Sequence, residues 1–423
     1  MGKVRIADLP HALGDRMHLS QRALGIQASP IRKLAPLMVE AKRRGVAIHH
    51  LNIGQPDIPT PEAYWDALKH YQDPVLSYGP SDGLPGLRQA IVAYFSRYGI
   101  SLAEPDILVT TGGSEAISFA FSAIGDFGDE VIVPEPFYTN YNGFATLAGL
   151  KMVPVTTRAE NGFRLPPPEA FDRAITPRTR AILVCSPNNP TGTILTREEV
   201  QGLAGLARKH DLFLIGDEVY KEFTYEGARH TSLLELEGMD DRVIVVDSIS
   251  KRFSACGARV GALISRNRDV MEAVLKFGQA RLCPPTAEQV GAIAAYRMDP
   301  SYFDPIRKEY QARRDTLYAG LTASPDVVLR KPEGAFYMIV KLPVKDTDAF
   351  ARWLLTDFQV DGETIMVAPG DGFYATPGLG GDEIRVAYVL ETEKLERAAK
   401  ILVAGMEEYL SPSRNREAVV MAK

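Results

Sequence analysis

The 423-residue chain has few cysteines and no recognisable pairing among them. Cys185, Cys256 and Cys283 have no spacing typical of a zinc site or a disulfide framework. The first 20 or so residues contain no continuous apolar stretch of the length that a signal peptide or a membrane-spanning helix needs. We therefore expect a cytoplasmic protein in a reducing setting, without export, membrane anchoring or a metal site.

An excess of basic charge is also absent. The 48 Lys and Arg residues against 53 Asp and Glu residues give a formal net charge of -5, without a basic stripe along the chain. This balance argues against nucleic acid as a partner. No Gly-x-Gly-x-x-Gly follows an early strand, which excludes a Rossmann-type dehydrogenase. The hydrophobic content of 45% is enough for a large core and two domains.

Short apolar runs alternate with helical patterns from Glu104 onward. This alternation predicts βαβ units in a mostly parallel sheet, with helices on both faces in a three-layer α/β domain. Ligands of such a sheet bind beyond the carboxyl ends of the strands. The expected strands are Ile107–Thr110, Glu130–Pro134, Ala181–Cys185, Phe213–Asp217, Val243–Asp247 and Gly261–Ile264.

The pattern changes after about Pro300, where a long charged helix is expected from Tyr302 to about Leu321, followed by a strand region over 334–342. This part is expected to form a smaller α/β domain. The turn-rich segment 52–57 closes a helical segment that begins near Ser29, and we expect it to pack on the small domain or on a partner. The predicted division is therefore an N-terminal arm (1–60), a large domain (61–300) and a C-terminal small domain (301–423).

The most informative motif is Ser248-Ile-Ser-Lys-Arg-Phe-Ser-Ala-Cys-Gly-Ala-Arg-Val-Gly261, directly after an expected strand. A lysine can form an imine with an aldehyde cofactor once its amine is deprotonated, and nearby cations and burial favour the deprotonated form. Ser248, Ser250 and Arg259 can hold a phosphate, the arginine in bidentate fashion. A lysine near an arginine is usually a solvated surface pair, but the flanking serines and glycines favour a site at Lys251.

A second motif is the strand that ends at Asp217, with Tyr220 three residues later. A carboxylate at this place can pair with a protonated pyridine nitrogen and keep the ring electron-withdrawing. The tyrosine can hydrogen-bond the phenolic oxygen of such a ring. Taken alone, Asp217 could equally be the N-cap of a strand-to-helix turn.

Three further segments are weaker signals when each is taken alone. Ser186–Gly192 is rich in Asn, Pro and Gly and is typical of a turn. The glycine pair in 110–116 lies between a strand and a helix, where exposed amides suit a phosphate. Arg385 lies inside an apolar strand, and a buried arginine needs an anion such as a substrate α-carboxylate or a structural ion-pair partner.

These five segments, in this order, resemble the class I/II aminotransferases of the fold type I pyridoxal-phosphate enzymes, and the resemblance runs from about Asn52 to Arg385. It implies that Lys251 forms the Schiff base with the cofactor, that Asp217 pairs with the ring nitrogen, and that Asn189 and Tyr220 hydrogen-bond the phenolic oxygen. Asn188 matches no family role.

The resemblance also implies the groups around the rest of the cofactor and the substrate. The implied phosphate ligands are Gly112, Gly113, Ser114, Ser248, Ser250 and Arg259, the ring-stacking aromatic is Tyr138, and the α-carboxylate clamp is Arg385. Gly54 resembles the N-terminal glycine segment that closes over the substrate. Tyr78 resembles a tyrosine that reaches the phosphate of the neighbouring subunit, so a homodimer with shared active sites is expected.

By the same resemblance, Lys251 moves the α-proton and the ring acts as electron sink, which predicts ping-pong transfer to a 2-oxo acid such as 2-oxoglutarate. Aspartate is the first expectation for the amino donor. A second arginine must then bind the side-chain carboxylate, and Arg281 and Arg32 are the candidates; the lysine that some relatives carry at Ser114 or Glu115 is missing.

Aromatic, alanine-type or other amino-acid substrates stay open, as does a carbon-sulfur β-lyase with the same cofactor residues. A non-enzymatic ligand sensor is a remote alternative, because such proteins carry an added winged-helix domain and the region before Asn52 is too short for one.

Overall fold

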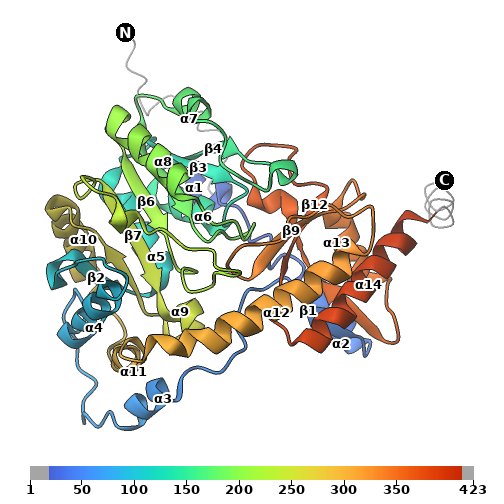
Figure 1. Ribbon diagram of the computed structural model, residues 1–423, viewed down its shortest axis with the longest axis horizontal. Coiled ribbons are helices and arrows are strands. Elements are labelled where there is room, and N and C mark those ends of the chain that lie inside the picture. Colours follow the sequence, from blue (N-terminus) through green and yellow to red (C-terminus); the bar gives the residue numbers. More distant parts are fainter. Residues whose placement is uncertain (1–18, 412–423) are drawn as a thin grey trace, which may run out of the picture.

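The computed structural model describes residues 19–411 (Figure 1). Within these residues, no helix is long and apolar enough to cross a membrane. The extreme N-terminal segment considered above lies outside the described residues.

The centre of the molecule is a seven-stranded sheet with the order β2-β8-β7-β6-β5-β3-β4. All neighbouring strands pair in parallel except β8, which is antiparallel to both β2 and β7. This confirms the mostly parallel sheet. The strands are β2 (Ile107–Thr110), β3 (Glu130–Glu135), β4 (Lys151–Thr156), β5 (Thr179–Cys185), β6 (Phe213–Asp217), β7 (Val243–Ser248) and β8 (Gly261–Ile264).

Six of these strands were expected from the sequence, and β4 was not. The β4 sequence Lys-Met-Val-Pro-Val-Thr carries Pro154 and polar ends, a pattern that weakens a strand prediction. Among the strands that the structure describes, β4 pairs with β3 alone, so it lies at the edge of the sheet, where a proline is tolerated.

Both faces of the sheet are buried, as the near-continuous apolar strands predict. On β5, Ile182 and Val184 face one core cluster, and Ala181 and Leu183 face the other. One face is covered by α5 (Gly112–Ile124), α6 (Asn140–Ala148) and α10 (Arg268–Arg281). The other is covered by α4 (Pro85–Ser96), α8 (Arg197–His210) and α11 (Thr286–Tyr296), and α3 (Glu62–Lys69), α7 (Pro168–Ala174) and α9 (Ile249–Arg252) complete this part.

A second, smaller arrangement follows α12 (Phe303–Thr322), the long helix expected from the sequence. Figure 1 shows α12 running from beside α11 to α14. Three strands form an antiparallel sheet in the order β11-β12-β9. The elements are β9 (Tyr337–Lys341), β10 (Glu363–Met366), β11 (Ala368–Pro369), β12 (Glu383–Ala387), α13 (Thr347–Thr356) and α14 (Thr392–Leu410).

The N-terminal segment contains α1 (Gln21–Gly25), α2 (Ala35–Arg43) and β1 (Ala47–His50). The β1 strand pairs in parallel with β10 and α2 packs on α13 of the smaller part, whereas Arg22 of α1 donates to the Leu147 carbonyl of the large part at 3.3 Å. After β1 the chain runs through Asn52, whose carbonyl accepts a hydrogen bond from Arg385 of the smaller part, and Gly54, whose carbonyl accepts one from Lys251 of the large part. The domain boundaries at residues 60 and 300 stay a prediction.

Candidate active site

The polar residues that follow separate strands meet in one cavity of about 550 Å³. Because the carboxyl ends of β5, β6 and β7 lie at the same edge of the parallel sheet, segments far apart in the chain converge there. The predicted residues that line it are Gly54, Gly113, Ser114, Tyr138, Asn189, Asp217, Tyr220, Ser248, Ser250, Lys251, Arg259 and Arg385.

Lys251 lies on the short helix α9, directly after β7. The helix begins because the Ser248 hydroxyl accepts a hydrogen bond from the Ser250 amide at 3.1 Å, an N-cap. The Lys251 ammonium donates to the Gly54 carbonyl at 2.9 Å, so the N-terminal arm contacts the candidate catalytic lysine. A side chain at Gly54 would overlap with the Tyr337 ring, which explains why a glycine is needed at this approach.

Asp217 lies at the end of β6 and is almost fully buried. Burial raises the pKa of its carboxyl to about 6, although hydrogen bonds from the Tyr141 hydroxyl and the Val219 amide oppose this rise. The Tyr141 hydroxyl donates to Oδ2 at 2.6 Å. A carboxylate kept in such surroundings is poised to bind a cationic partner, because the partner would recover the charge stabilisation lost on burial.

Asn189 and Tyr220, both expected to hydrogen-bond the phenolic oxygen of the cofactor, lie next to each other in the cavity. The Asn189 side-chain amide donates to the Tyr220 hydroxyl at 3.4 Å, and the Tyr220 and Tyr337 hydroxyls lie 3.0 Å apart. Burial raises the pKa of Tyr220 well above its usual value, so the phenol stays protonated and available as a donor.

The opposite end of the cavity has the features of an anion site. The expected glycines Gly112 and Gly113 begin α5, and Gly113 and Ser114 line the cavity. Ser248, Ser250 and Arg259, which lie at the end of β7 and in the connection from β7 to β8, line it as well. A side chain at Gly112, where φ is +73°, would overlap with the Arg259 guanidinium. Together, a helix N-terminus, hydroxyls and an arginine make a cradle that only glycine leaves open.

Arg385 is buried in β12 with its Nε lacking a hydrogen-bond partner among the described residues. Its other nitrogens donate to the Asn52 carbonyl and, at 3.1 Å, to the Asn189 side chain. The guanidinium lies over the rings of Tyr337 and Phe373 at 4.6 and 4.9 Å. No carboxylate between residues 19 and 411 pairs with it, and burial lowers its pKa, so a bound anion would supply the missing partner.

Tyr138 is held in the cavity by its neighbours on α6. The Asn140 side chain donates to the Tyr138 hydroxyl at 2.8 Å, and the Tyr138 and Tyr141 rings meet edge to face at 5.4 Å. Burial raises the pKa of the Tyr138 phenol to about 12. The ring is therefore a fixed, uncharged surface at the side of the cavity.

The structure places the three other candidate residues, Tyr78, Arg281 and Arg32, in different surroundings. Tyr78 is 81% exposed and does not line the cavity of its own chain. Arg281 lies outside the cavity, where it hydrogen-bonds the Ser81 carbonyl at 3.1 Å and approaches Glu115 at 3.7 Å. Arg32 does line the cavity.

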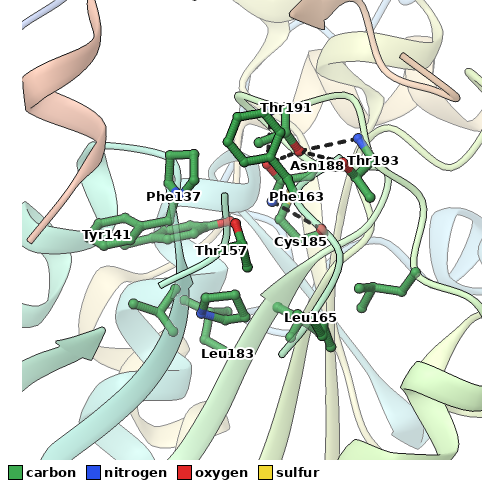
Figure 2. A pocket seen from close by; sticks show the side chains of 15 residues that line it. Phe137, Tyr141, Thr157, Phe163, Leu165, Leu183, Cys185, Asn188, Thr191 and Thr193 are labelled. Carbon is green, nitrogen blue, oxygen red and sulfur yellow. Dashed lines mark hydrogen bonds between the residues drawn. The ribbon is translucent and has the colours of Figure 1, made fainter. Parts of the chain in front are cut away.

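Asn188, for which no role was expected, shapes the turn instead. Its side chain accepts hydrogen bonds from the Thr191 amide and hydroxyl at 3.1 and 3.0 Å. Figure 2 shows Asn188 and Thr191 beside a cavity of about 20 Å³, which Tyr141 and Cys185 also line. The turn thus holds the neighbouring Asn189 in place.

Sequence reasoning missed four residues of the site: Tyr141, Tyr337, Asn140 and Asn52. Tyr141 follows Tyr138 by three residues near the start of a helix, and such a spacing places two side chains on one face. Tyr337 lies two residues before Ile339, which pairs with Arg385, so strand alternation places Tyr337 and Arg385 on one face. These two spacings were usable signals; the carbonyl of Asn52 gave none.

Known proteins resemble the chain over most of its length. The aspartate aminotransferase of Bacillus subtilis (strain 168) is 31% identical over 404 residues, which cover 93% of this chain and 100% of that protein. Aromatic-amino-acid aminotransferase 2 of Thermococcus litoralis is 34% identical over 392 residues, 90% of this chain and 96% of the relative.

The solved structure of the alanine aminotransferase from Pyrococcus furiosus superposes with a TM-score of 0.85 at 32% identity, and the match covers 92% of this chain and 100% of that structure. The three-layer arrangement is therefore that of the fold type I transferases. Residues 47–402 match the family aminotransferase class I and II, and this chain is a member of it.

Proposed function

We propose that this aminotransferase works with pyridoxal 5′-phosphate and moves an amino group from an L-amino acid, aspartate first, to a 2-oxo acid such as 2-oxoglutarate. The observation that supports this most strongly is the single cavity in which Lys251, Asp217, Arg259 and Arg385 come together from four separate segments. Each of these side chains meets a different chemical need of that reaction.

The shape and the donor groups of the cavity fit the cofactor. Its phosphate suits the cradle of Gly112, Gly113 and Ser114 at the start of α5, together with Ser248, Ser250 and Arg259. Its ring nitrogen suits Asp217, and its phenolic oxygen suits the hydroxyl and amide of Tyr220 and Asn189. Tyr138 would supply a flat surface at the side of the ring.

Lys251 would hold the cofactor covalently and then move the proton. When bound, pyridoxal phosphate supplies an electron-withdrawing ring that stabilises negative charge on the substrate Cα. In this reaction the Lys251 amine would take the α-proton as general base and would return it at the other end of the reacting system. The Gly54 carbonyl, 2.9 Å from Nζ, orients the amine.

Asp217 would keep the ring nitrogen protonated because a buried carboxylate favours a cationic partner. The Tyr141 hydrogen bond fixes the carboxylate and favours its ionised form. Asp217 therefore controls how strongly the ring draws electrons, without touching the substrate.

Arg385 would bind the α-carboxylate in bidentate fashion. Its guanidinium plane is already held by the Asn52 carbonyl and the Asn189 side chain, so little conformational entropy is lost on binding. The Gly54 segment, which contacts both Lys251 and Tyr337, would close the cavity against water.

Aspartate is placed first because several relatives are named aspartate aminotransferases. Relatives named for aromatic amino acids and alanine keep those substrates as alternatives. Ping-pong kinetics are expected, and a carbon-sulfur β-lyase would differ by releasing ammonia without an acceptor.

A homodimer with shared active sites is part of the proposal. Tyr78 is highly exposed, and the exposed Val75 and Leu76 lie beside it, which suits a segment that contacts a second copy of the chain. A cytoplasmic setting is proposed because all three cysteines are free.

The test is a half-reaction without an acceptor. Purified holoenzyme is mixed with aspartate, alanine or phenylalanine, and the visible absorbance of the cofactor is followed together with the 2-oxo acid released. Loss of the starting band with one equivalent of oxo acid and no free ammonia supports transamination. Ammonia release would instead identify a lyase, and a protein that cannot be loaded with the cofactor would contradict the proposal.

A further inference from the structure

The start of α5 carries a negative charge that the proposed function has not yet used. Glu115 directly follows Ser114 in the first turn of this helix, and its carboxylate accepts a hydrogen bond from the Thr111 amide at 2.8 Å. The helix N-terminus stabilises this carboxylate for the same reason that it suits a phosphate. An uncompensated Glu115 would therefore oppose the binding of a phosphate at this helix start.

Thr111 connects this carboxylate to the candidate phosphate site. Its amide donates to Glu115, and its carbonyl accepts a hydrogen bond from Nη2 of Arg259 at 3.5 Å. Arg259 lines the cavity and is the arginine proposed to bind the phosphate. A single residue thus separates the Glu115 carboxylate from that arginine, and the Glu115 side chain is only 16% exposed, so water screens its charge incompletely.

Arg281, at the end of α10, supplies the opposite charge. Its Nε lies 3.7 Å from Oε1 of Glu115, a distance typical of an ion pair and too long for a hydrogen bond. Its Nη2 donates to the Ser81 carbonyl at 3.1 Å and to the Val109 carbonyl at 3.4 Å. These two carbonyls hold the guanidinium in place, and its charge acts on Glu115 from there.

Arg281 reaches Glu115 from outside the cavity. It does not line the cavity, and among residues 19–411 Glu115 is the one carboxylate with which it forms an ion pair. Burial lowers the pKa of Arg281, and the charge of Glu115 opposes this effect. Each member of the pair therefore compensates the charge of the other in a partly buried place.

We propose that Arg281 neutralises Glu115 and thereby preserves the affinity of the α5 N-terminus for the phosphate of the cofactor. The proposal rests on the proposed function, which places that phosphate at the start of α5. Arg281 acts through Glu115 and is therefore a positioning residue. The carboxylate can then hold the Thr111 amide, and with it the start of the helix, without weakening the phosphate site.

The test measures how tightly the full-length apoprotein binds pyridoxal phosphate and pyridoxal, which lacks the phosphate. Arg281→Met removes the charge and keeps a long side chain. It should raise the Kd for pyridoxal phosphate about 10-fold, because a negative charge near the phosphate is no longer compensated. The Kd for pyridoxal should change by less than about 2-fold, because pyridoxal brings no charge to this end of the cavity.

Glu115→Gln should act in the opposite direction. The Gln side-chain oxygen can still accept the hydrogen bond from the Thr111 amide, while the charge of Arg281 becomes an added attraction for the phosphate. The Kd for pyridoxal phosphate should fall about 3- to 10-fold. The double variant, Arg281→Met with Glu115→Gln, carries neither charge and should bind pyridoxal phosphate within about 3-fold of wild type.

The other end of α10 offers a matched control. Arg268 pairs with Asp106 at 2.8 Å, and the Asp106 carboxylate accepts a hydrogen bond from the Ala103 amide at 2.7 Å. This is the same arrangement of arginine, carboxylate and backbone amide, but neither side chain lines the cavity. Arg268→Met should leave the Kd values of both ligands unchanged.

A purely structural role of Arg281 predicts a different pattern. If its bonds to the Ser81 and Val109 carbonyls only held the fold, Arg281→Met would weaken pyridoxal phosphate and pyridoxal alike, and Glu115→Gln would rescue neither. That pattern overturns the proposal, as does an Arg281→Met variant that binds pyridoxal phosphate as tightly as wild type.

Two further outcomes are informative. If Arg281→Met does not fold, Glu115→Gln alone decides: tighter binding of pyridoxal phosphate with unchanged binding of pyridoxal supports the proposal, and unchanged or weaker binding of pyridoxal phosphate overturns it. Wild-type protein that binds no pyridoxal phosphate contradicts the proposed function itself, so the failure of either proposal can be recognised.

Discussion

The Tyr141 hydroxyl donates a 2.6 Å hydrogen bond to Oδ2 of Asp217, so a residue of α6 holds the carboxylate at the end of β6. This bond lowers the pKa of Asp217 while burial raises it. The ionised form of Asp217, which the proposed mechanism needs, therefore depends on a contact between two segments 76 residues apart.

Replacing Tyr141 by Phe removes that bond and preserves the ring. The pKa of Asp217 should rise further, and kcat/KM should fall about 10-fold at pH 7, the effect of one lost charged hydrogen bond. The deficit should shrink toward pH 9, where the carboxyl is ionised in both proteins. The pH dependence of kcat/KM is the measurement, with Tyr98→Phe, whose hydroxyl bonds Glu222 outside the cavity, as control. An equal deficit at all pH values would contradict this reading.

The same carboxyl should reduce the stability of the apoprotein. A folded-state pKa of about 6 against an ordinary value of 3.8 means that the native state binds a proton more tightly than the unfolded chain. Between these two values the stability falls as the pH rises, and above pH 6 the full cost is present. The difference of about 2 pKa units corresponds to about 3 kcal/mol.

Asp217→Asn should therefore make the apoprotein more stable than wild type at pH 7.5, and the two proteins should converge near pH 4.5. Urea unfolding at both pH values measures this. The same variant should lose most of the transaminase activity, an exchange of activity for stability. A variant less stable than wild type at pH 7.5 would show that the carboxylate is satisfied by groups other than Tyr141 and Val219.

The glycine that opens α5 gives a test of the phosphate cradle. Gly112→Ala places a methyl group against Arg259 in a backbone conformation with φ of +73°, so affinity for pyridoxal phosphate should drop. We expect a Kd raised at least about 10-fold, the effect of one displaced charged contact. Gly202→Ala is the matched control, because α8 leaves open space there and alanine favours a helix. Equal cofactor affinity of both variants would argue against the cradle.

The turn that carries Lys251 rests on a buried ion pair. Asp247 accepts hydrogen bonds from the Ser248 amide and from Arg252, with both charged side chains fully buried. Arg252→Met leaves the carboxylate with Lys221, whose ammonium lies 3.8 Å away. This variant should lower the free energy of unfolding by about 3 to 5 kcal/mol.

Lys221→Met should cost clearly less. The Lys221 ammonium lies 3.4 Å from the Phe95 ring centroid, and burial lowers its pKa to about 8, so its charge is already costly in the folded state. Asp247 keeps Arg252 in this variant. Urea unfolding at pH 7 compares the two, and the reverse order of stability would contradict the assignment of Arg252 as the main partner.

Much of the large domain could be predicted because buried parallel strands have a strong local signature. The runs around Leu183 and Ile215 are continuous and apolar, and each site motif follows directly after such a run. Since parallel strands end at one edge, the convergence of Lys251, Asp217 and Asn189 followed from their positions along the chain.

The features that the sequence did not predict depend on contacts between distant segments. Edge strand β4 has no continuous apolar run, and of the described strands β3 alone pairs with it. The choice between Arg281 and Arg32 could not be made from the sequence, since both are arginines near turns. It depends on tertiary contacts: Arg281 bonds the Ser81 carbonyl, and the docking of Lys33 on Asp348 leaves Arg32 toward the cavity.

The most direct test of the account is to find which lysine carries the cofactor. Purified holoenzyme is reduced with borohydride and digested, and the peptide with the pyridoxyl label is sequenced by mass spectrometry. Lys221 is the informative competitor, because it is buried with a lowered pKa but lies outside the cavity. The account predicts label on Lys251 and none in Lys251→Ala; label on Lys221 or another lysine, or no covalent label at all, would contradict it.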